Sequence, residues 1–322
     1  MEHLPPAASQ RTVRAPAVTG SRRRRWQPSW PVDRATTLGP LARGRSDPTI
    51  RVRRDEVRLA TRMPDGPVRL HLRKTGDEVL AEAWGPGAAQ ALHGVPGMLG
   101  QADDPAGFAA DAHPVMAAAF RRYGAGWRVP RTERVLEALV PAILEQRVTG
   151  LESRRAWAWL VRRYGQPAPG PANPELLVAP DGPEWARIPS WAWHRAGVDP
   201  GRAGTVMAAA ARARALESLS QRPPGDACAA LRALPGVGGW TAAEVAVRAW
   251  GDADAVSFGD YHLAREIGHA LTGRRDGDDA LLAALLTPWA GHRARAVRMI
   301  ELHVGHAPRR GPRATITDHR GR

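Results

Sequence analysis

Two features of this sequence could carry chemistry: a glycine-rich turn at 234–239 and an acidic residue, Asp260. The turn, Leu-Pro-Gly-Val-Gly-Gly, lies between two short segments with helical patterns. Proline ends the first helix, and the glycines permit a tight turn that leaves backbone N–H groups free at the start of the second. Such a helix end binds a phosphate oxygen. The residues predicted to contact phosphate are Leu234, Gly236, Val237, Gly238 and Thr241. The turn alone is equally typical of a purely structural helical hairpin.

Asp260 follows Trp240 by twenty positions and opens the next helical segment, YHLAREIGHAL. A carboxylate at that place can cap the helix by accepting its free amides. It can also stabilise a positive charge that develops on a bound molecule. Taken alone, the capping role is the simpler interpretation.

Composition narrows the class of protein. The 322 residues include 46 Lys and Arg against 32 Asp and Glu, a formal net charge of +14, which favours a polyanionic partner. The single cysteine, Cys228, excludes a disulfide framework and any four-cysteine zinc or iron–sulfur site. No apolar run approaches the roughly 18 residues of a membrane span, and the N-terminus lacks the apolar segment of a secretory signal. We therefore expect a cytoplasmic protein.

The hydropathy pattern divides the chain into four parts. Residues 1–25 are polar and arginine-rich, which predicts a disordered basic arm, and 307–322 form a similar basic tail. Residues 26–115 contain alternating segments around 50–82 that predict a small antiparallel sheet with at least one helix. Residues 116–306 show helical periodicity almost throughout. The expected fold class is therefore mainly α with an α+β N-terminal domain.

Three motifs in order resemble those of the helix–hairpin–helix DNA glycosylase superfamily, and within it the bacterial 3-methyladenine DNA glycosylase II branch. LPGVGGWTA (234–242) is followed by FGDY (258–261). Upstream, 142–165 resembles the helix with which that family reaches the DNA minor groove, and downstream, 287–300 resembles its late pocket segment. The resemblance covers about 115–305 and implies the fold of that superfamily.

The resemblance implies that Asp260 is the catalytic carboxylate. An N-glycosidic bond breaks through an oxocarbenium-like sugar, whose positive charge a nearby carboxylate stabilises. Relatives that also cleave the DNA backbone carry a lysine before the position of Thr241, where this chain has Trp240, and the only lysine is Lys74. We therefore expect hydrolysis by water, without lyase activity. Some relatives carry an iron–sulfur cluster, which one cysteine excludes, so no cofactor is expected.

The resemblance also implies a pocket for a flipped base, lined by Trp240, Tyr261 and Trp289. Glu244 stands where the best-known branch has an aromatic residue. It either faces this pocket or pairs with Arg248 on the surface, and the surface pairing is slightly favoured.

Two further roles are implied at the DNA interface. Gln146 and Arg147 occupy the places from which the family fills the gap left by a flipped base. Arg147 would either stack between bases as a wedge or contact a phosphate. Relatives hold a monovalent cation at the hairpin, which here would use the main-chain carbonyls of Arg232, Leu234 and Val237.

The predicted function is a monofunctional DNA glycosylase of base-excision repair. It would act as a monomer on double-stranded DNA and remove alkylated bases of the 3-methyladenine or 7-methylguanine type. Two alternatives stay open: a non-catalytic DNA-binding module, and a glycosylase for neutral lesions such as hypoxanthine or uracil.

Overall fold

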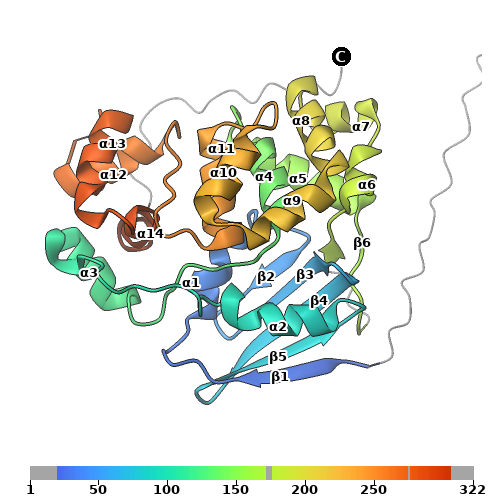
Figure 1. Cartoon of the computed structure of the whole chain (residues 1–322), viewed down its shortest axis with the longest axis horizontal. Helices are drawn as coiled ribbons and strands as arrows, with labels where there is room; N and C mark the ends of the chain where they lie inside the picture. The colour runs from blue at the N-terminus through green and yellow to red at the C-terminus, as the bar shows by residue number, and fades with distance from the viewer. Residues whose placement is uncertain (1–19, 172–175, 275, 306–322) are drawn as a thin grey trace, which may run out of the picture.

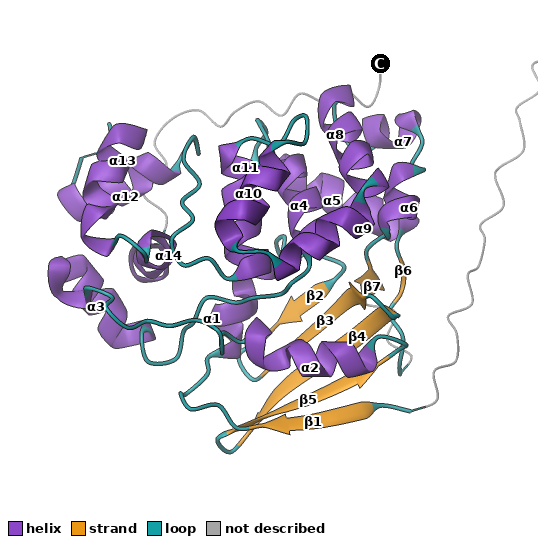
Figure 2. Ribbon diagram, in the orientation of Figure 1, coloured by secondary structure: helices purple, strands orange, loops and turns teal. Residues whose placement is uncertain are grey.

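The computed structural model describes residues 20–171, 176–274 and 276–305. An antiparallel sheet lies below a larger group of helices in Figure 1, and Figure 2 separates the two by colour. Within the described ranges, no helix combines the length and the apolar character needed to span a bilayer. The fold class is mainly α with a sheet near the N-terminus, which confirms the prediction.

The sheet consists of antiparallel strands in the order β1-β5-β4-β3-β2. The side chains of Val68, Leu70 and Leu72 alternate along β4 and are fully buried, as a period of two predicts. Helix α2 packs across this face of the sheet. The strands are β1 (Arg22–Trp26), β2 (Ile50–Val52), β3 (Glu56–Met63), β4 (Gly66–Thr75) and β5 (Glu78–Trp84), with a small second pair, β6 (Gln166–Pro167) and β7 (Leu177–Val178).

Strand β1 corrects the extent of the predicted basic arm. Arg22–Arg25, expected within a disordered segment, are paired with β5. Two ion pairs across the strands, Arg23 with Glu82 and Arg25 with Glu78, offset the repulsion within the arginine run. The rest of the arm (1–19) and the predicted basic tail lie outside the described residues.

The helical part begins with α3 and covers the range in which the sequence shows helical periodicity. Thr149 and Glu152 form a reciprocal capping box at the start of α5, which fixes where that helix begins. The helices are α1 (Arg34–Leu38), η1 (Gly39–Leu41), α2 (Ala88–Met98), η2 (Ala110–Ala112), α3 (Pro114–Tyr123), α4 (Val135–Glu145), α5 (Gly150–Tyr164), α6 (Gly182–Ala186), α7 (Ser190–Arg195), α8 (Pro200–Ala211), α9 (Ala213–Ser218), η3 (Leu219–Gln221), α10 (Pro224–Arg232), α11 (Gly239–Val245), the π-helical turn η4 (Ala246–Trp250), α12 (Leu263–Thr272), α13 (Asp279–Leu286), η5 (Thr287–Trp289) and α14 (Arg293–Val304).

The described residues bury three large hydrophobic clusters and one small one. The first lies between the sheet and α2. The second, central cluster is built from α4 to α11 and η4. The third joins α3 to α12, α13 and α14, on the left of Figure 1. The loop that carries Asp260 leads from the central cluster to the third one, so it lies where two separately packed bodies meet.

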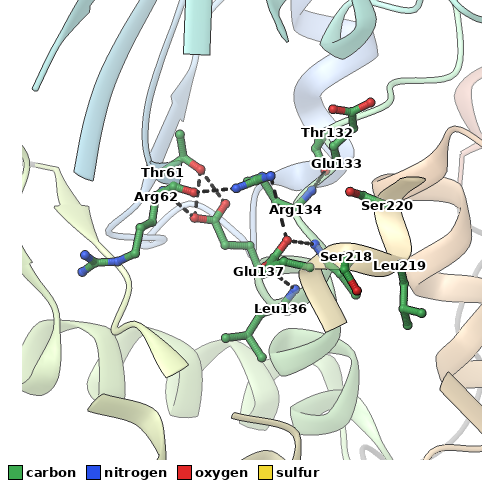
Figure 3. A network of polar contacts seen from close by, with 12 residues as sticks. Thr61, Arg62, Thr132, Glu133, Arg134, Leu136, Glu137, Ser218, Leu219 and Ser220 are labelled. Carbon is green, nitrogen blue, oxygen red and sulfur yellow. Dashed lines mark hydrogen bonds and ion pairs between the residues drawn. The ribbon is translucent and has the colours of Figure 1, made fainter. Parts of the chain in front are cut away.

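A buried carboxylate fastens the sheet to the central helices (Figure 3). Glu137 of α4 accepts hydrogen bonds from the Thr61 hydroxyl at 2.7 Å and from the Arg62 amide at 2.8 Å, both on β3. Arg134 donates to the Arg62 carbonyl at 3.1 Å from the same helix. Burial raises the pKa of the Glu137 carboxyl, although the bonds from Thr61 and Arg62 oppose that rise. The network fixes α4, whose far end reaches the candidate site.

The segment between the sheet and α3 packs with the C-terminal helices. Asp103 forms an ion pair with Arg295 of α14, and the Ala109 carbonyl accepts the indole N–H of Trp289 at 2.8 Å. The sequence assigned this segment to the N-terminal domain, 26–115. In the structure, residues 103–112 lie against η5 and α14 near the C-terminal end of the described chain. Asp103 and the Ala109 carbonyl find their polar partners there.

Candidate active site

Asp260 lies in the loop between η4 and α12, and both of its carboxylate oxygens accept hydrogen bonds. Oδ1 accepts the backbone amides of His262 and Leu263 at 2.8 and 2.9 Å. Oδ2 accepts the indole N–H of Trp240 at 3.1 Å. The amides belong to the start of α12, and the indole belongs to α11. The carboxylate is therefore held from two sides in one orientation, and it satisfies free amides of the helix as the sequence suggested.

A cavity of about 510 Å³ lies beside Asp260, within the size range of small-molecule sites. Its walls come from the loop after η1, the ends of α4 and α5, the helix formed by α11 and η4, and from α12 and α14. Four arginines line it: Arg43, Arg154, Arg248 and Arg298. Four glutamates line it as well: Glu145, Glu244, Glu266 and Glu301. The cavity wall therefore carries charges of both signs among apolar side chains.

The structure does not assemble the predicted aromatic pocket. Trp289 is only 2% exposed and lies in the third hydrophobic cluster, with its indole N–H bonded to a main-chain carbonyl. Tyr261 is 73% exposed, and its ring lies 4.8 Å from the Arg265 guanidinium. Trp240 packs against the central cluster and contacts Asp260 without lining the cavity. Trp240 and Trp289 pack against hydrophobic clusters and Tyr261 faces solvent, so none of the three rings lines the cavity.

Glu244 both lines the cavity and pairs with Arg248. The Arg248 Nη1 lies 2.7 Å from Glu244 Oε2, and the Ser257 hydroxyl donates to Oε1. The predicted pairing is confirmed, but its surface location is wrong, since the two side chains are 17% and 19% exposed. Burial would raise the pKa of Glu244, but Arg248, Ser257 and Arg43 outweigh it and lower that pKa. Glu244 is therefore a stable carboxylate inside the cavity.

The glycine turn is locked by its neighbours. Gly236 adopts a φ of 83°, and a Cβ on it would meet the Thr205 hydroxyl at 2.2 Å. The Gln146 side-chain amide donates to the Gly236 carbonyl at 2.9 Å and to the Thr241 hydroxyl at 2.8 Å. The end of α4 thus holds the hairpin in place.

The hairpin offers backbone rather than side chains to a phosphate. Val237 and Thr241 are 5% and 2% exposed, so their side chains face the protein. Leu234 is half-buried, whereas Gly238 is exposed and no side chain caps α11 among the described residues. The amides at this end remain available to an anion. Phosphate binding here stays a prediction.

The two predicted wedge residues behave differently. The Gln146 amide is committed to the hairpin and is therefore not free to enter DNA. Arg147 is exposed and has a φ of 55°, a conformation that residues other than glycine rarely adopt. Arg147 thus combines a strained backbone with an exposed side chain two residues after α4, and its wedge role stays a prediction.

Of the main-chain carbonyls predicted to hold a cation, those of Leu234 and Val237 lie on the turn and that of Arg232 belongs to the last residue of α10. The Leu234 carbonyl accepts the Val237 amide at 3.0 Å, which leaves one of its two lone pairs for an ion. The Arg232 and Val237 carbonyls would complete the predicted set. In the described ranges no group of three or more His, Cys, Asp or Glu could hold a metal. The monovalent ion stays a prediction, and no catalytic step requires it.

Replacing Gly236 by Ala is expected to weaken DNA binding about tenfold, because an L-residue at this φ is strained by about 1–2 kcal/mol and its Cβ would displace Thr205. Fluorescence anisotropy with a short duplex at several salt concentrations measures the effect. Gly225→Ala on α10 is the matched control, since a Cβ there meets nothing within 4 Å. Equal affinity of both variants and the wild-type chain would contradict a role for the hairpin in DNA binding.

Several residues that line the cavity were not predicted from the sequence. Arg43 and Glu145 form an ion pair at 3.1 Å although they are 102 positions apart, so no local pattern could reveal them. Trp127 lies in a loop without a motif. Arg298 and Glu301, which pair at 3.1 Å, lie in or next to the late segment at 287–300 that the resemblance indicated. The resemblance of 287–300 was the one feature of the sequence that could have indicated these lining residues.

Several solved structures superpose on this chain. A 3-methyladenine DNA-glycosylase from Archaeoglobus fulgidus superposes with a TM-score of 0.73 at 16% identity, covering 86% of this chain and 97% of that one. The 8-oxoguanine glycosylase/lyase of Clostridium acetobutylicum in its apo form gives 0.58 at 12% identity, covering 79% and 98%. The same enzyme with double-stranded DNA gives 0.56 at 12% identity, covering 79% and 97%.

At the level of sequence, no family profile and no curated protein matches the chain. At these identities the structural likeness concerns the fold. It agrees with the order of motifs around the hairpin and Asp260. The chain therefore has the fold of the helix–hairpin–helix DNA glycosylases.

Proposed function

We propose that this chain is a monofunctional DNA glycosylase that hydrolyses the N-glycosidic bond of a damaged base in double-stranded DNA. The observation that carries the proposal is the position of Asp260, whose carboxylate is held by Trp240 and two amides at the edge of a cavity large enough for a base. A protein that only binds DNA needs no such carboxylate beside a cavity. The enzyme would act as a monomer on a nucleotide flipped out of the duplex.

In the proposed reaction the bond between C1′ and the base nitrogen breaks, and its electron pair leaves with the base. The sugar becomes an oxocarbenium-like cation. A carboxylate about 4 Å from that cation stabilises it by roughly 4 kcal/mol at an effective dielectric constant near 20. Water then adds to C1′ and loses a proton. A neutral base takes up one proton as it leaves, whereas a positively charged alkylated purine leaves as a neutral base and the proton passes to the solvent. Asp260 supplies the carboxylate.

The absence of strand cleavage follows from Trp240. A lyase needs an amine nucleophile that forms a Schiff base with C1′. The position before Thr241 carries an indole, and that indole already donates to Asp260. Water is then the nucleophile.

Two lesion classes are candidates. The resemblance and the likeness to the Archaeoglobus fulgidus enzyme favour alkylated purines. Alkylated purines of this kind are positively charged and leave readily, and aromatic faces would favour them by about 0.5–2 kcal/mol. The lining also contains hydrogen-bonding side chains such as Ser257 and Arg248, which are compatible instead with a neutral base that is held by hydrogen bonds.

The proposal is tested with duplexes that each carry one 3-methyladenine, 7-methylguanine, hypoxanthine or uracil. Released base is measured by chromatography, and strand breaks are measured before and after hot alkali. We expect free base from at least one duplex and breaks only after alkali. Binding without release from any duplex would support a DNA-binding module, and breaks before alkali would indicate a lyase.

A further inference from the structure

The five-stranded sheet has two faces of opposite character. One face is apolar and packs against α2, with Val57, Leu70 and Ala83 among its buried residues. On the other face, directly paired residues of neighbouring strands form two rows that cross the sheet, because partners in an antiparallel pair lie on the same side. The rows are Arg23, Glu82, His71, Arg58 and Arg51, and next to them Arg25, Leu80, Arg73, Glu56 and Arg53. These residues form the arginine face of the sheet.

The arginine face is open to solvent. The small pair of strands β6 and β7 covers one end of this side of the sheet, where Val178 packs against Ala60. Beyond that end, four arginine side chains project into solvent. Their exposed fractions are 67% for Arg23, 70% for Arg25, 76% for Arg53 and 45% for Arg73. These guanidinium groups are therefore accessible to an external anion.

The arginines of this face outnumber the carboxylates that they contact. Two carboxylates are each shared by two arginines, in the sets Glu82 with Arg23 and Arg73, and Glu56 with Arg53 and Arg58. A further pair, Arg25 with Glu78, has an N···O separation of 3.4 Å. A guanidinium carries five N–H donors, so an arginine that shares a carboxylate keeps donors for a second anion. The face therefore has an excess of positive charge and of free donors.

The side chains of these rows indicate which polyanion fits them. A guanidinium binds a phosphate through two parallel hydrogen bonds, so rows of guanidinium groups suit a phosphate backbone. Proteins that hold single strands stack the bases on exposed aromatic rings. The only ring in the two rows is that of His71, which is 12% exposed and whose Nε2 lies 2.7 Å from Glu56 Oε2. The face therefore fits the backbone of a duplex rather than unpaired bases.

The arginine face and the glycine hairpin lie in different parts of the molecule. Strand β1 forms the lower edge of the sheet in Figure 1, whereas α10 and α11, which flank the glycine turn, lie in the upper part. DNA contacts at these two places are therefore separate sites.

We propose that the arginine face binds the phosphate backbone of a second DNA duplex while the hairpin engages the first. The face contacts phosphates and carries no information about sequence. One chain then bridges two duplexes and passes directly to the second before it releases the first. The inference rests on the DNA contact of the hairpin, but it requires neither Asp260 nor the release of a base.

The test mixes the full chain with two short duplexes that carry a donor and an acceptor fluorophore. Energy transfer reports bridging, and light scattering gives the mass of the complex. We expect transfer within a complex of one chain and two duplexes. A labelled first duplex should also dissociate faster as unlabelled duplex is added. The combined variant Arg23→Gln, Arg25→Gln, Arg53→Gln and Arg73→Gln should bind the second duplex about tenfold or more weakly, and the salt slope of that binding should fall by about 0.9 for each lost phosphate contact.

A second variant with only Arg53→Gln and Arg73→Gln leaves β1 unchanged and decides the outcome if the larger variant fails to fold. The matched control removes the same charge from exposed arginines elsewhere, with Arg121→Gln, Arg187→Gln, Arg195→Gln and Arg214→Gln combined. The control should bridge as the wild-type chain does, and all variants should bind the first duplex within about twofold of it.

Three results would overturn the inference and leave the proposed function intact. They are no bridging by the wild-type chain, a bridged complex that contains two chains, and equal bridging by the variants of the arginine face and by the control. Failure of the wild-type chain to bind even one duplex would instead overturn the proposed function.

Discussion

The Asp260→Asn variant is expected to release damaged bases about a thousandfold more slowly than the wild-type chain, with DNA affinity nearly unchanged. Asparagine has the same size and can still accept from the amides of His262 and Leu263, so the loop keeps its shape. The negative charge beside the sugar is lost. The NH₂ group of the introduced asparagine also faces the indole N–H of Trp240, so two donors meet where Oδ2 accepts a hydrogen bond in the wild-type chain.

Single-turnover release on the best substrate measures the rate of Asp260→Asn, and anisotropy measures its affinity over a range of salt. Binding should be retained and should fall steeply with salt, because phosphate contacts dominate it. Asp252→Asn is the matched control, since Asp252 lies in the same loop and does not line the cavity. Equal rates for Asp260→Asn and the wild-type chain would refute the proposed mechanism.

Asp103→Ala is expected to cost about 3–5 kcal/mol of unfolding free energy, the usual effect of removing one partner of a buried ion pair. Asp103 and Arg295 are 3% and 1% exposed, and the second carboxylate oxygen accepts the Val129 amide at 2.9 Å. The substitution leaves the Val129 amide without its acceptor and the buried guanidinium without its counter-ion. The third hydrophobic cluster should loosen, because this pair ties α14 to the segment after the sheet.

Urea denaturation measures the effect of Asp103→Ala as a lower midpoint with a similar slope. Asp276→Ala serves as the control because its ion pair with Arg274 is largely exposed, at 70% and 63%. Such pairs contribute little to stability. An unchanged midpoint for Asp103→Ala would show that the third cluster does not depend on the pair.

The elements were predictable wherever a local pattern determines them. Alternation along Val68, Leu70 and Leu72 predicted β4, and helical periodicity predicted the helix that the structure shows as α5. Strand β1 was missed because Arg22–Arg25 has no alternation; its partners lie about sixty positions away in β5, as the contact between Arg23 and Glu82 shows. Charge pairing across strands cannot be seen in one segment.

The candidate site was predictable only where its residues lie close together in the sequence. The hairpin and Asp260 lie close in sequence, and the structure joins Trp240 to Asp260 directly. The exposure of Tyr261 and the burial of Trp289 depend on tertiary packing that a motif does not contain. The pair of Arg43 and Glu145 depends on how α4 is docked against the chain preceding β2.

The meeting of separately packed bodies around the cavity has a consequence for how this protein can evolve. Arg43, Glu244 and Glu301 reach the cavity from three different parts of the chain, and each part rests on its own hydrophobic support. A substitution in one wall need not repack the other two. Under the proposed function, substrate choice can therefore change through substitutions in one wall while Asp260 and the hairpin stay unchanged.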